Sequence, residues 1–210
     1  MTADATRSRP SNEVKFETRN PVVQRMIGGF FDVLRDVVGP LNPRSTLDAG
    51  CGEGETIERL APLLGDRVSA IDISSYSVDR AAERLPEVDV SRGSVTELPF
   101  PDDSFDLVLC LEVIEHLDDP RRAVRELARV ARRDIVVSVP YEPWFRLGSL
   151  ARGKYLRSFG NHPEHVNHFN RRTLVALLEP TLEISAVEVA FPWLIAHGRV
   201  RSDPADAAAR

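Results

Sequence analysis

The first apolar pattern in the chain has the period of an amphipathic helix. Between residues 22 and 38, apolar side chains recur mostly at three- and four-residue spacing, which places them on one helical face. Asn20-Pro21 is a typical helix start, because proline at the first helical position loses no hydrogen bond, and Gly39-Pro40 is a typical end. The pattern therefore predicts an N-terminal helix over residues 21–39.

Short apolar strands alternate with helical patterns in the next hundred residues. The predicted strands are residues 45–49, 68–72, 88–92, 105–111 and 135–139. The predicted helices are residues 53–64, residues 76–85 and a third that starts at Asp119-Pro120 and buries Ala131 on its apolar face. Pro62 lies inside the first of these helices and is expected to kink or shorten it.

The end of the chain closes the pattern. A helix is predicted over residues 173–178, followed by strands over 182–189 and 193–200 on either side of Phe191-Pro192. The whole alternation predicts an α/β fold with a Rossmann-like, doubly wound sheet and helices on both faces. We expect about seven strands, mostly parallel, with the last one antiparallel.

Composition and charge narrow the class of protein. At 210 residues and 42% hydrophobic content, the chain suits one domain with a sizeable core, and its net charge of −5 gives no general attraction for nucleic acid. Cys51 and Cys110 are expected to be free thiols of an intracellular protein. No apolar run approaches the roughly 20 residues that a membrane-spanning helix needs, and the N-terminus lacks the apolar segment of a signal peptide. We therefore expect a cytoplasmic protein.

Three glycines at alternate positions, Gly50, Gly52 and Gly54, separate the first predicted strand of the sheet from its helix. Glycine allows a tight turn and the close approach of a ligand to the backbone. A dinucleotide-binding loop would carry glycine where Glu55 stands, and no Gly-Lys-Ser/Thr sequence follows as in a phosphate-binding loop. Glu53 and Glu55 would also repel a pyrophosphate. The turn therefore predicts a nucleotide-like ligand without phosphates.

Two aspartates sharpen this prediction. Asp72 ends the second strand, where a carboxylate can accept hydrogen bonds from both ribose hydroxyls. Asp48 ends the first strand and can attract an ammonium group, directly or through water. An adenosine that carries an amino-acid tail would satisfy both carboxylates and the glycine turn.

Four motifs follow one another over roughly residues 45–140. They are Asp48-Ala-Gly-Cys-Gly-Glu-Gly54, Ile71-Asp72-Ile73-Ser74, Leu98-Pro-Phe-Pro-Asp-Asp-Ser-Phe-Asp106 and Glu112-Val-Ile-Glu-His-Leu117. In this order they resemble class I S-adenosylmethionine-dependent methyltransferases. The most similar branch is the small-molecule one that includes ubiquinone-pathway O-methyltransferases.

The resemblance implies S-adenosylmethionine as the cofactor and a set of residues that contact it. Gly50 and Gly52 would approach the methionine part, and Asp72 would bind the ribose. Ser94 and Val95 would flank the adenine, although many relatives carry aspartate where Ser94 stands. The remaining residues of the implied cofactor site are Asp48, Cys51, Ile73, Leu111 and Glu112.

The resemblance also implies a reaction, the transfer of a methyl group to an oxygen, or alternatively a nitrogen, of a small molecule. Such a transfer needs the acceptor held in line with the methyl group, and a hydroxyl acceptor also benefits from a base. His116 and the cluster His162-Pro-Glu-His165-Val-Asn-His168 are near the predicted acceptor side. Neutral imidazole suits proton removal near pH 7, so we take His116, His165 and His168 as candidate catalytic residues, with a structural role in their loops as the alternative.

Two other functions stay open. Glu112-x-x-Glu115-His116 with a later histidine, His162 or His165, resembles the metal site of small-RNA 3′-terminal 2′-O-methyltransferases. We assign no metal, because this spacing also occurs in metal-free relatives and because the negative charge disfavours RNA. The other alternative is a partner subunit that binds the cofactor without catalysing transfer.

The expected organisation is a single methyltransferase domain over residues 1–210. A flexible N-terminus (1–20) and the first helix (21–39) precede a cofactor-binding core (45–140), a substrate lid (141–170), a closing helix and strand pair (171–200) and a tail (201–210). Aromatic and basic residues interleave over residues 141–159. This composition suits a lid that packs on the sheet edge, one that closes over an aromatic or anionic acceptor, or a segment that contacts a membrane surface.

Overall fold

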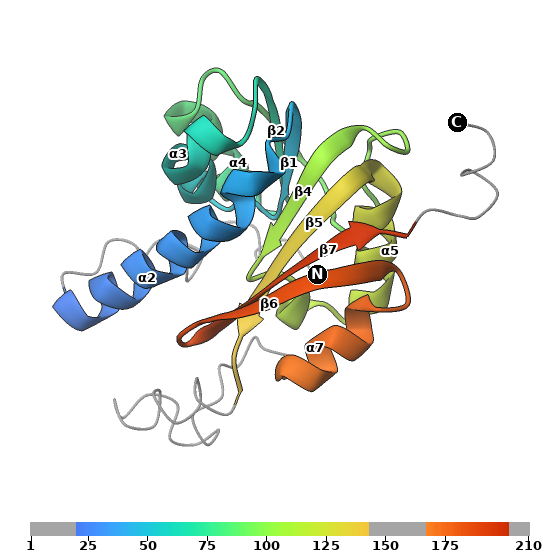
Figure 1. Ribbon diagram of the computed structural model, residues 1–210. Coiled ribbons are helices and arrows are strands. Elements are labelled where there is room, and N and C mark those ends of the chain that lie inside the picture. Colours follow the sequence, from blue (N-terminus) through green and yellow to red (C-terminus); the bar gives the residue numbers. More distant parts are fainter. Residues whose placement is uncertain (1–19, 143–166, 202–210) are drawn as a thin grey trace, which may run out of the picture.

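The computed structural model describes residues 20–142 and 167–201, which form a seven-stranded sheet in the order β3-β2-β1-β4-β5-β7-β6 (Figure 1). The first five strands pair in parallel, whereas β7 runs antiparallel to both β5 and β6. The bounds are β1 Ser45–Ala49, β2 Arg67–Asp72, β3 Asp89–Arg92, β4 Phe105–Leu111, β5 Ala131–Pro140, β6 Leu182–Ala190 and β7 Trp193–Val200. The predicted Rossmann-like sheet with an antiparallel last strand is confirmed.

Helices cover both faces of this sheet (Figure 1). One face carries α2 Pro21–Val38, α3 Glu55–Leu60 and α4 Ser75–Arg84, and the other carries α5 Pro120–Val130 and α7 Arg171–Leu178. Every residue of β4 is buried between the two layers, as expected for a central parallel strand.

The first helix begins where the sequence predicts. The Asn20 side chain caps α2 by accepting hydrogen bonds from the backbone nitrogens of Val22 (2.9 Å) and Val23 (3.5 Å). The helix buries Phe31 and Leu34 against the sheet, while its first turn remains largely exposed.

Three local predictions need correction or refinement. The helix predicted over 53–64 is shorter, because Gly54 has a left-handed backbone and is the N-cap of α3. At the other end, Pro62 lies in the 3-10 turn η2 Ala61–Leu63, which agrees with the shortening expected from this proline. Ala131 opens β5 instead of lying on the preceding helix. Two further 3-10 turns, η1 Gly39–Leu41 and η3 Ile114–His116, were not predicted.

Parts of three predicted segments lie outside the described residues, namely the N-terminus up to residue 19, residues 143–166 of the lid and the tail from residue 202. Within the portion that is described, no helix is both long and apolar enough to cross a membrane. Because β1 to β5 are parallel, their carboxyl ends all reach the same edge of the sheet, where ligands bind in open α/β folds.

Candidate active site

The glycine turn follows β1 at this edge of the sheet. Gly50 (φ 93°), Gly52 (φ 53°) and Gly54 (φ 82°) all have the left-handed backbone that favours glycine. A Cβ on Gly50 would overlap the side chain of Val113, whereas a Cβ on Gly52 would have nothing within 4 Å. The turn is therefore packed against protein at Gly50 and has open space for a ligand at Gly52.

Asp72 holds the turn from the end of β2. Its Oδ2 accepts a hydrogen bond from the backbone nitrogen of Gly52 (2.9 Å), and its Oδ1 accepts one from Ser74 (2.8 Å). Each carboxylate oxygen has two lone pairs, so both oxygens keep capacity for a ligand hydroxyl. The sequence predicts the ligand role of Asp72 but not its contact with Gly52, because spacing does not reveal the register between β1 and β2.

Asp48 lies buried below the turn. Its side chain is 2% exposed, and its Oδ2 has no hydrogen-bond partner among the described residues. Burial, and then the negative charge of Asp72, raise the pKa of the Asp48 carboxyl to about 7. A buried oxygen of this kind is costly unless a donor reaches it, and the ammonium group of a methionine moiety would provide both a donor and a positive charge. The residues present therefore fit the amino-acid end of S-adenosylmethionine.

Cys51, between the two glycines, is also buried. Burial, with smaller effects from Asp48 and Asp72, raises the pKa of the Cys51 thiol well above its usual range. The thiol thus stays neutral and adds no further negative charge at the turn.

The ends of β2 and β3 provide the next candidates for binding the ligand. Ile73 directly follows Asp72 and is 68% exposed, although large apolar side chains are usually buried. The Gly93 nitrogen donates to the Asp72 carbonyl, which brings Ser94 next to this position. The Ser94 hydroxyl lies 2.8 Å from the Thr96 hydroxyl, and the Val95 side chain is buried in the core. Ile73 therefore offers an apolar surface and Ser94 a hydroxyl, whereas Val95 packs inward.

Glu112 connects the ends of β4 and β5. Its backbone nitrogen donates to the Ser138 carbonyl (3.1 Å), and its Oε1 accepts from the Ser138 hydroxyl (3.1 Å). Its φ of 59° is left-handed, which costs a glutamate on the order of 1 kcal/mol and is typical of functional sites. The preceding Leu111 belongs to the apolar cluster under α2.

His116 lies at the end of η3, beside a buried carboxylate. Its Nε2 is 3.9 Å from Oε1 of Glu115, which is 1% exposed. Asn167 fixes this loop from far along the chain. Its backbone nitrogen donates to the Glu115 carbonyl (3.0 Å), and its Nδ2 donates to the Leu117 carbonyl (2.6 Å).

His168 lies at the end of β5. The Glu142 nitrogen donates to the Phe169 carbonyl (2.9 Å), and His168 Nδ1 is 3.8 Å from Glu142 Oε1. Residues 167–169 thus link the loop of His116 to the end of β5, and each of these two imidazoles has a carboxylate neighbour. His165 lies outside the described residues.

Sequence reasoning missed Glu142 and Asn167. Glu142 follows a buried strand at the ligand-binding edge, a position that could have identified it. No sequence signal connects Asn167 to Leu117, 50 residues earlier.

The fifth histidine, His197, contacts Asp134 at 2.9 Å. Asp134 lies toward the amino end of β5, so this buried pair belongs to the opposite edge of the sheet.

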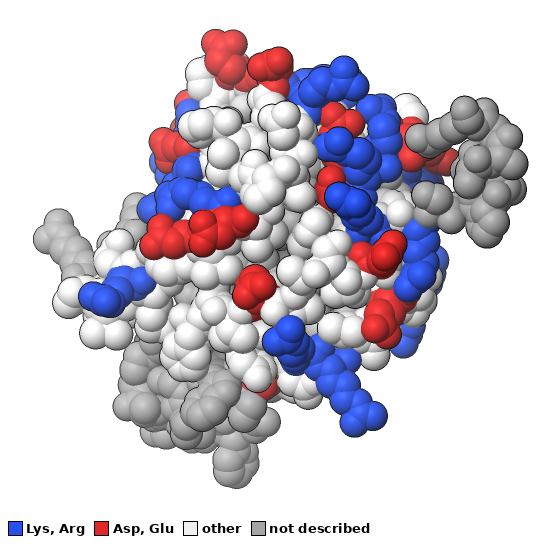
Figure 2. Space-filling view, in the orientation of Figure 1, with Lys and Arg blue, Asp and Glu red and all other residues white. Residues whose placement is uncertain are grey.

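Two features concern the metal and RNA alternatives, namely the arrangement of possible metal ligands and the distribution of surface charge. Within residues 20–142 and 167–201, no three His, Cys, Asp or Glu side chains come together to hold a metal ion. On the face shown in Figure 2, acidic and basic side chains are interspersed. Glu55, for example, pairs with both Arg59 and Arg84 at 2.6 Å. His162, the other suggested ligand, lies outside the described residues.

Comparisons with known proteins find methyltransferases with similar sequences. Residues 47–138 match the family model of a methyltransferase domain. A probable S-adenosylmethionine-dependent methyltransferase of Mycobacterium tuberculosis (strain CDC 1551 / Oshkosh) is 36% identical over 160 residues, which cover 75% of this chain and 54% of that protein. The chain therefore spans about half the length of this relative. The 27-O-demethylrifamycin SV methyltransferase of Amycolatopsis mediterranei is 41% identical over 92 residues, 41% of this chain and 34% of that protein.

A solved structure has the same fold. The magnesium protoporphyrin IX methyltransferase of Synechocystis PCC 6803, crystallised with bound SAH, superposes with a TM-score of 0.66 at 20% identity, over 88% of this chain and 89% of that one. The segment that matches the family model extends from β1 into β5 and includes the glycine turn, Asp72 and Glu112. In sequence and in fold, the described part of this chain is therefore similar to S-adenosylmethionine-dependent methyltransferases.

Proposed function

We propose that this protein transfers a methyl group from S-adenosylmethionine to an oxygen atom of a small molecule. The observation that carries the proposal is the open backbone at Gly52. It is held by Asp72 and lies near a buried oxygen of Asp48 that has no hydrogen-bond partner among the described residues. The relative named for 27-O-demethylrifamycin supports a small-molecule oxygen acceptor.

Asp72 and Asp48 divide the binding of the donor. The free lone pairs of Asp72 accept hydrogen bonds from the ribose hydroxyls, and Asp48 receives the ammonium group. Ile73 and Ser94 lie beside the adenine, and Leu111 and Glu112 line the other side of the cofactor. When bound, S-adenosylmethionine supplies an electrophilic methyl group on a positively charged sulfur.

His168 is the proposed base on the acceptor side, with His116 as the second candidate. The imidazole takes the proton of the acceptor hydroxyl as the oxygen–methyl bond forms and the methyl–sulfur bond breaks. The bonding electrons stay on sulfur, which leaves as a neutral thioether. Glu142 Oε1 lies 3.8 Å from His168 Nδ1 and places a carboxylate beside this imidazole.

Calorimetric titration with S-adenosylhomocysteine (SAH) tests the donor site. Asp72→Ala removes two acceptors for ribose hydroxyls and should weaken SAH binding by about 30-fold or more. Asp79→Ala removes a carboxylate from the exposed surface of α4 and should leave binding unchanged. Wild-type affinity in a folded Asp72→Ala protein would contradict the assignment.

Transfer itself is tested with methyl-labelled S-adenosylmethionine and a cell extract. Label should enter the low-molecular-weight fraction, and mass spectrometry of the product should place the methyl group on oxygen. A protein that binds SAH but labels nothing would support a non-catalytic partner subunit instead.

A further inference from the structure

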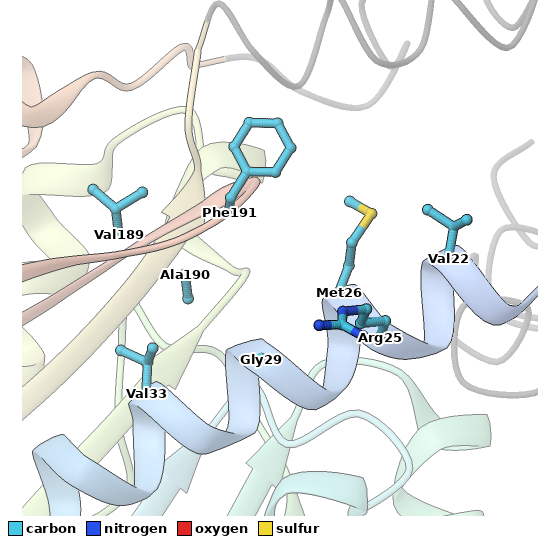
Figure 3. A pocket seen from close by; sticks show the side chains of 8 residues that line it. All are labelled: Val22, Arg25, Met26, Gly29, Val33, Val189, Ala190 and Phe191. Carbon is cyan, nitrogen blue, oxygen red and sulfur yellow. The ribbon is translucent and has the colours of Figure 1, made fainter.

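A groove separates α2 from the tip of the β6–β7 hairpin (Figure 3). The helix contributes Val22, Met26 and Val33 to one wall, and the hairpin contributes Val189 and Phe191 to the other. Both walls are mainly apolar, and nothing in the cofactor site described above uses them.

Exposed apolar side chains concentrate at this groove. Four large apolar residues in the described part of the chain are strongly exposed, and three of them line it: Val22 (65%), Phe191 (54%) and Val189 (47%). The fourth, Ile73, lies in the cofactor site. A contiguous exposed apolar surface of this kind usually marks a binding site.

The hairpin wall of the groove is continuous with the acceptor edge of the sheet. Trp193 pairs with Pro140 at the end of β5, and the Tyr141 nitrogen donates to the Pro192 carbonyl (2.8 Å). The Trp193 ring packs on Phe30 of α2 with centroids 5.2 Å apart. Backbone contacts therefore join the hairpin that forms this wall to the end of β5, where Glu142 and His168 lie.

Charge indicates what kind of molecule fits. Among the described residues, Arg25 is the only charged one that lines the groove; it is exposed, and this part of the chain contains no ion pair with it. A guanidinium without an ion-pair partner among the described residues, beside an apolar surface, favours a carboxylate on an apolar body. The net charge of −5 would by itself favour cations, so a preference for anions would have to come from this local site.

We infer that the groove binds the apolar body of an anionic, amphipathic small molecule that is the methyl acceptor. This inference rests on the proposed methyltransferase function and names the chemical class of its acceptor. The acceptor places its anionic group near Arg25, its apolar body along α2 and the hairpin, and its hydroxyl toward His168.

Two neighbouring glycines of α2 provide a matched test. A Cβ on either Gly28 or Gly29 meets nothing within 4 Å, but only Gly29 lines the groove. Calorimetry on the SAH-saturated protein would use dodecanoate as the anionic probe and dodecyltrimethylammonium as the cationic one. The wild type should bind dodecanoate more tightly than dodecyltrimethylammonium. Gly29→Glu should lower the affinity for dodecanoate at least about tenfold, and Gly28→Glu should change this affinity less than about twofold.

The charge is tested in the same way. Arg25→Gln should weaken the binding of dodecanoate but not that of dodecyltrimethylammonium. Arg121→Gln, on the exposed surface of α5, should change the affinity for neither probe. The inference is wrong if dodecanoate does not bind, or if both glycine variants weaken it equally. It is also wrong if dodecanoate binds only after deletion of residues 1–19. The same holds if the protein co-floats with phosphatidylglycerol vesicles in a density gradient but does not bind free dodecanoate.

Product partitioning connects the groove to catalysis. The methyl-labelled product should enter ethyl acetate after acidification and remain in water at neutral pH, as an amphipathic acid does. A product that stays in water at both pH values would overturn the inference and leave the methyltransferase assignment intact. If the wild-type protein does not bind SAH, the proposed function itself is contradicted.

Discussion

The proposed donor side and the proposed acceptor side of the active site are built in different ways. On the donor side, a glycine turn and Asp72 create the site from backbone conformation and one carboxylate. On the acceptor side, side chains from the loop after β4, the end of β5 and residues 167–169 meet through long-range contacts. A site made of backbone leaves a compact signature in the sequence, because its left-handed positions favour glycine. A site assembled from distant side chains leaves none.

The largest expected effect separates the two sides through catalysis. His168→Gln keeps a side chain of similar size but removes the base, so the rate of methyl transfer should fall about 100-fold. SAH affinity should stay within about twofold, because His168 belongs to the acceptor side alone. Initial rates with labelled S-adenosylmethionine and calorimetry with SAH measure the two quantities.

His116→Gln is the matched variant for this experiment. It should lower the rate less than about fivefold if His168 is the base. A larger fall in rate for His116→Gln than for His168→Gln would assign the role of the base to His116, with Glu115 as its carboxylate neighbour. A loss of SAH affinity in either variant would show that the two sides are not independent.

Most of the fold was predictable because hydrophobic periodicity reports burial directly. The nearly all-apolar segment of β4 and the Asn20-Pro21 start of α2 are examples where one local signal was enough. The errors occur where two local signals compete. Ala131 continues the spacing of a helical face, yet it opens β5, because pairing opposite Phe105 outweighs helical spacing.

For the proposed active site, the sequence indicated residues only where the contacts are local. Gly52 and Asp72 stand out in the sequence, although their hydrogen bond depends on the register between β1 and β2. Glu142 and Asn167 gain their positions from tertiary contacts, which have no period or motif.

A smaller effect is expected when the donor side is changed through its backbone. Gly52→Ala introduces a Cβ at φ 53°, where an L-residue is strained by about 1–2 kcal/mol, and places a methyl group in the space open to the ligand. SAH binding should weaken about 30-fold, as followed by calorimetry. Gly39→Ala, at a right-handed position with open space, is the control and should bind SAH normally. Normal binding by Gly52→Ala would show that the ligand does not approach this backbone.

The smallest expected effect is a pH dependence that belongs to the donor side alone. The pKa of Asp48 is raised to about 7, so the carboxyl is largely protonated in the free protein below this pH. An ammonium ligand prefers the ionised form. SAH affinity should therefore rise about tenfold between about pH 5.5 and pH 8 and then level off. Asp48→Asn should bind SAH weakly with little dependence on pH over the same range.

The same shift has the opposite consequence for stability. A carboxyl whose pKa is higher in the folded than in the unfolded protein destabilises the fold as the pH rises from the ordinary value of 3.8 toward 7. Without ligand, Asp48→Asn should therefore unfold at a higher temperature than the wild type at pH 8, and the difference should shrink at pH 5. Ligand should reverse the order at pH 8, because only the wild type gains the ammonium contact. Equal thermal stability of the two proteins at pH 8 without ligand would show that the ionised Asp48 carboxylate does not destabilise the free protein.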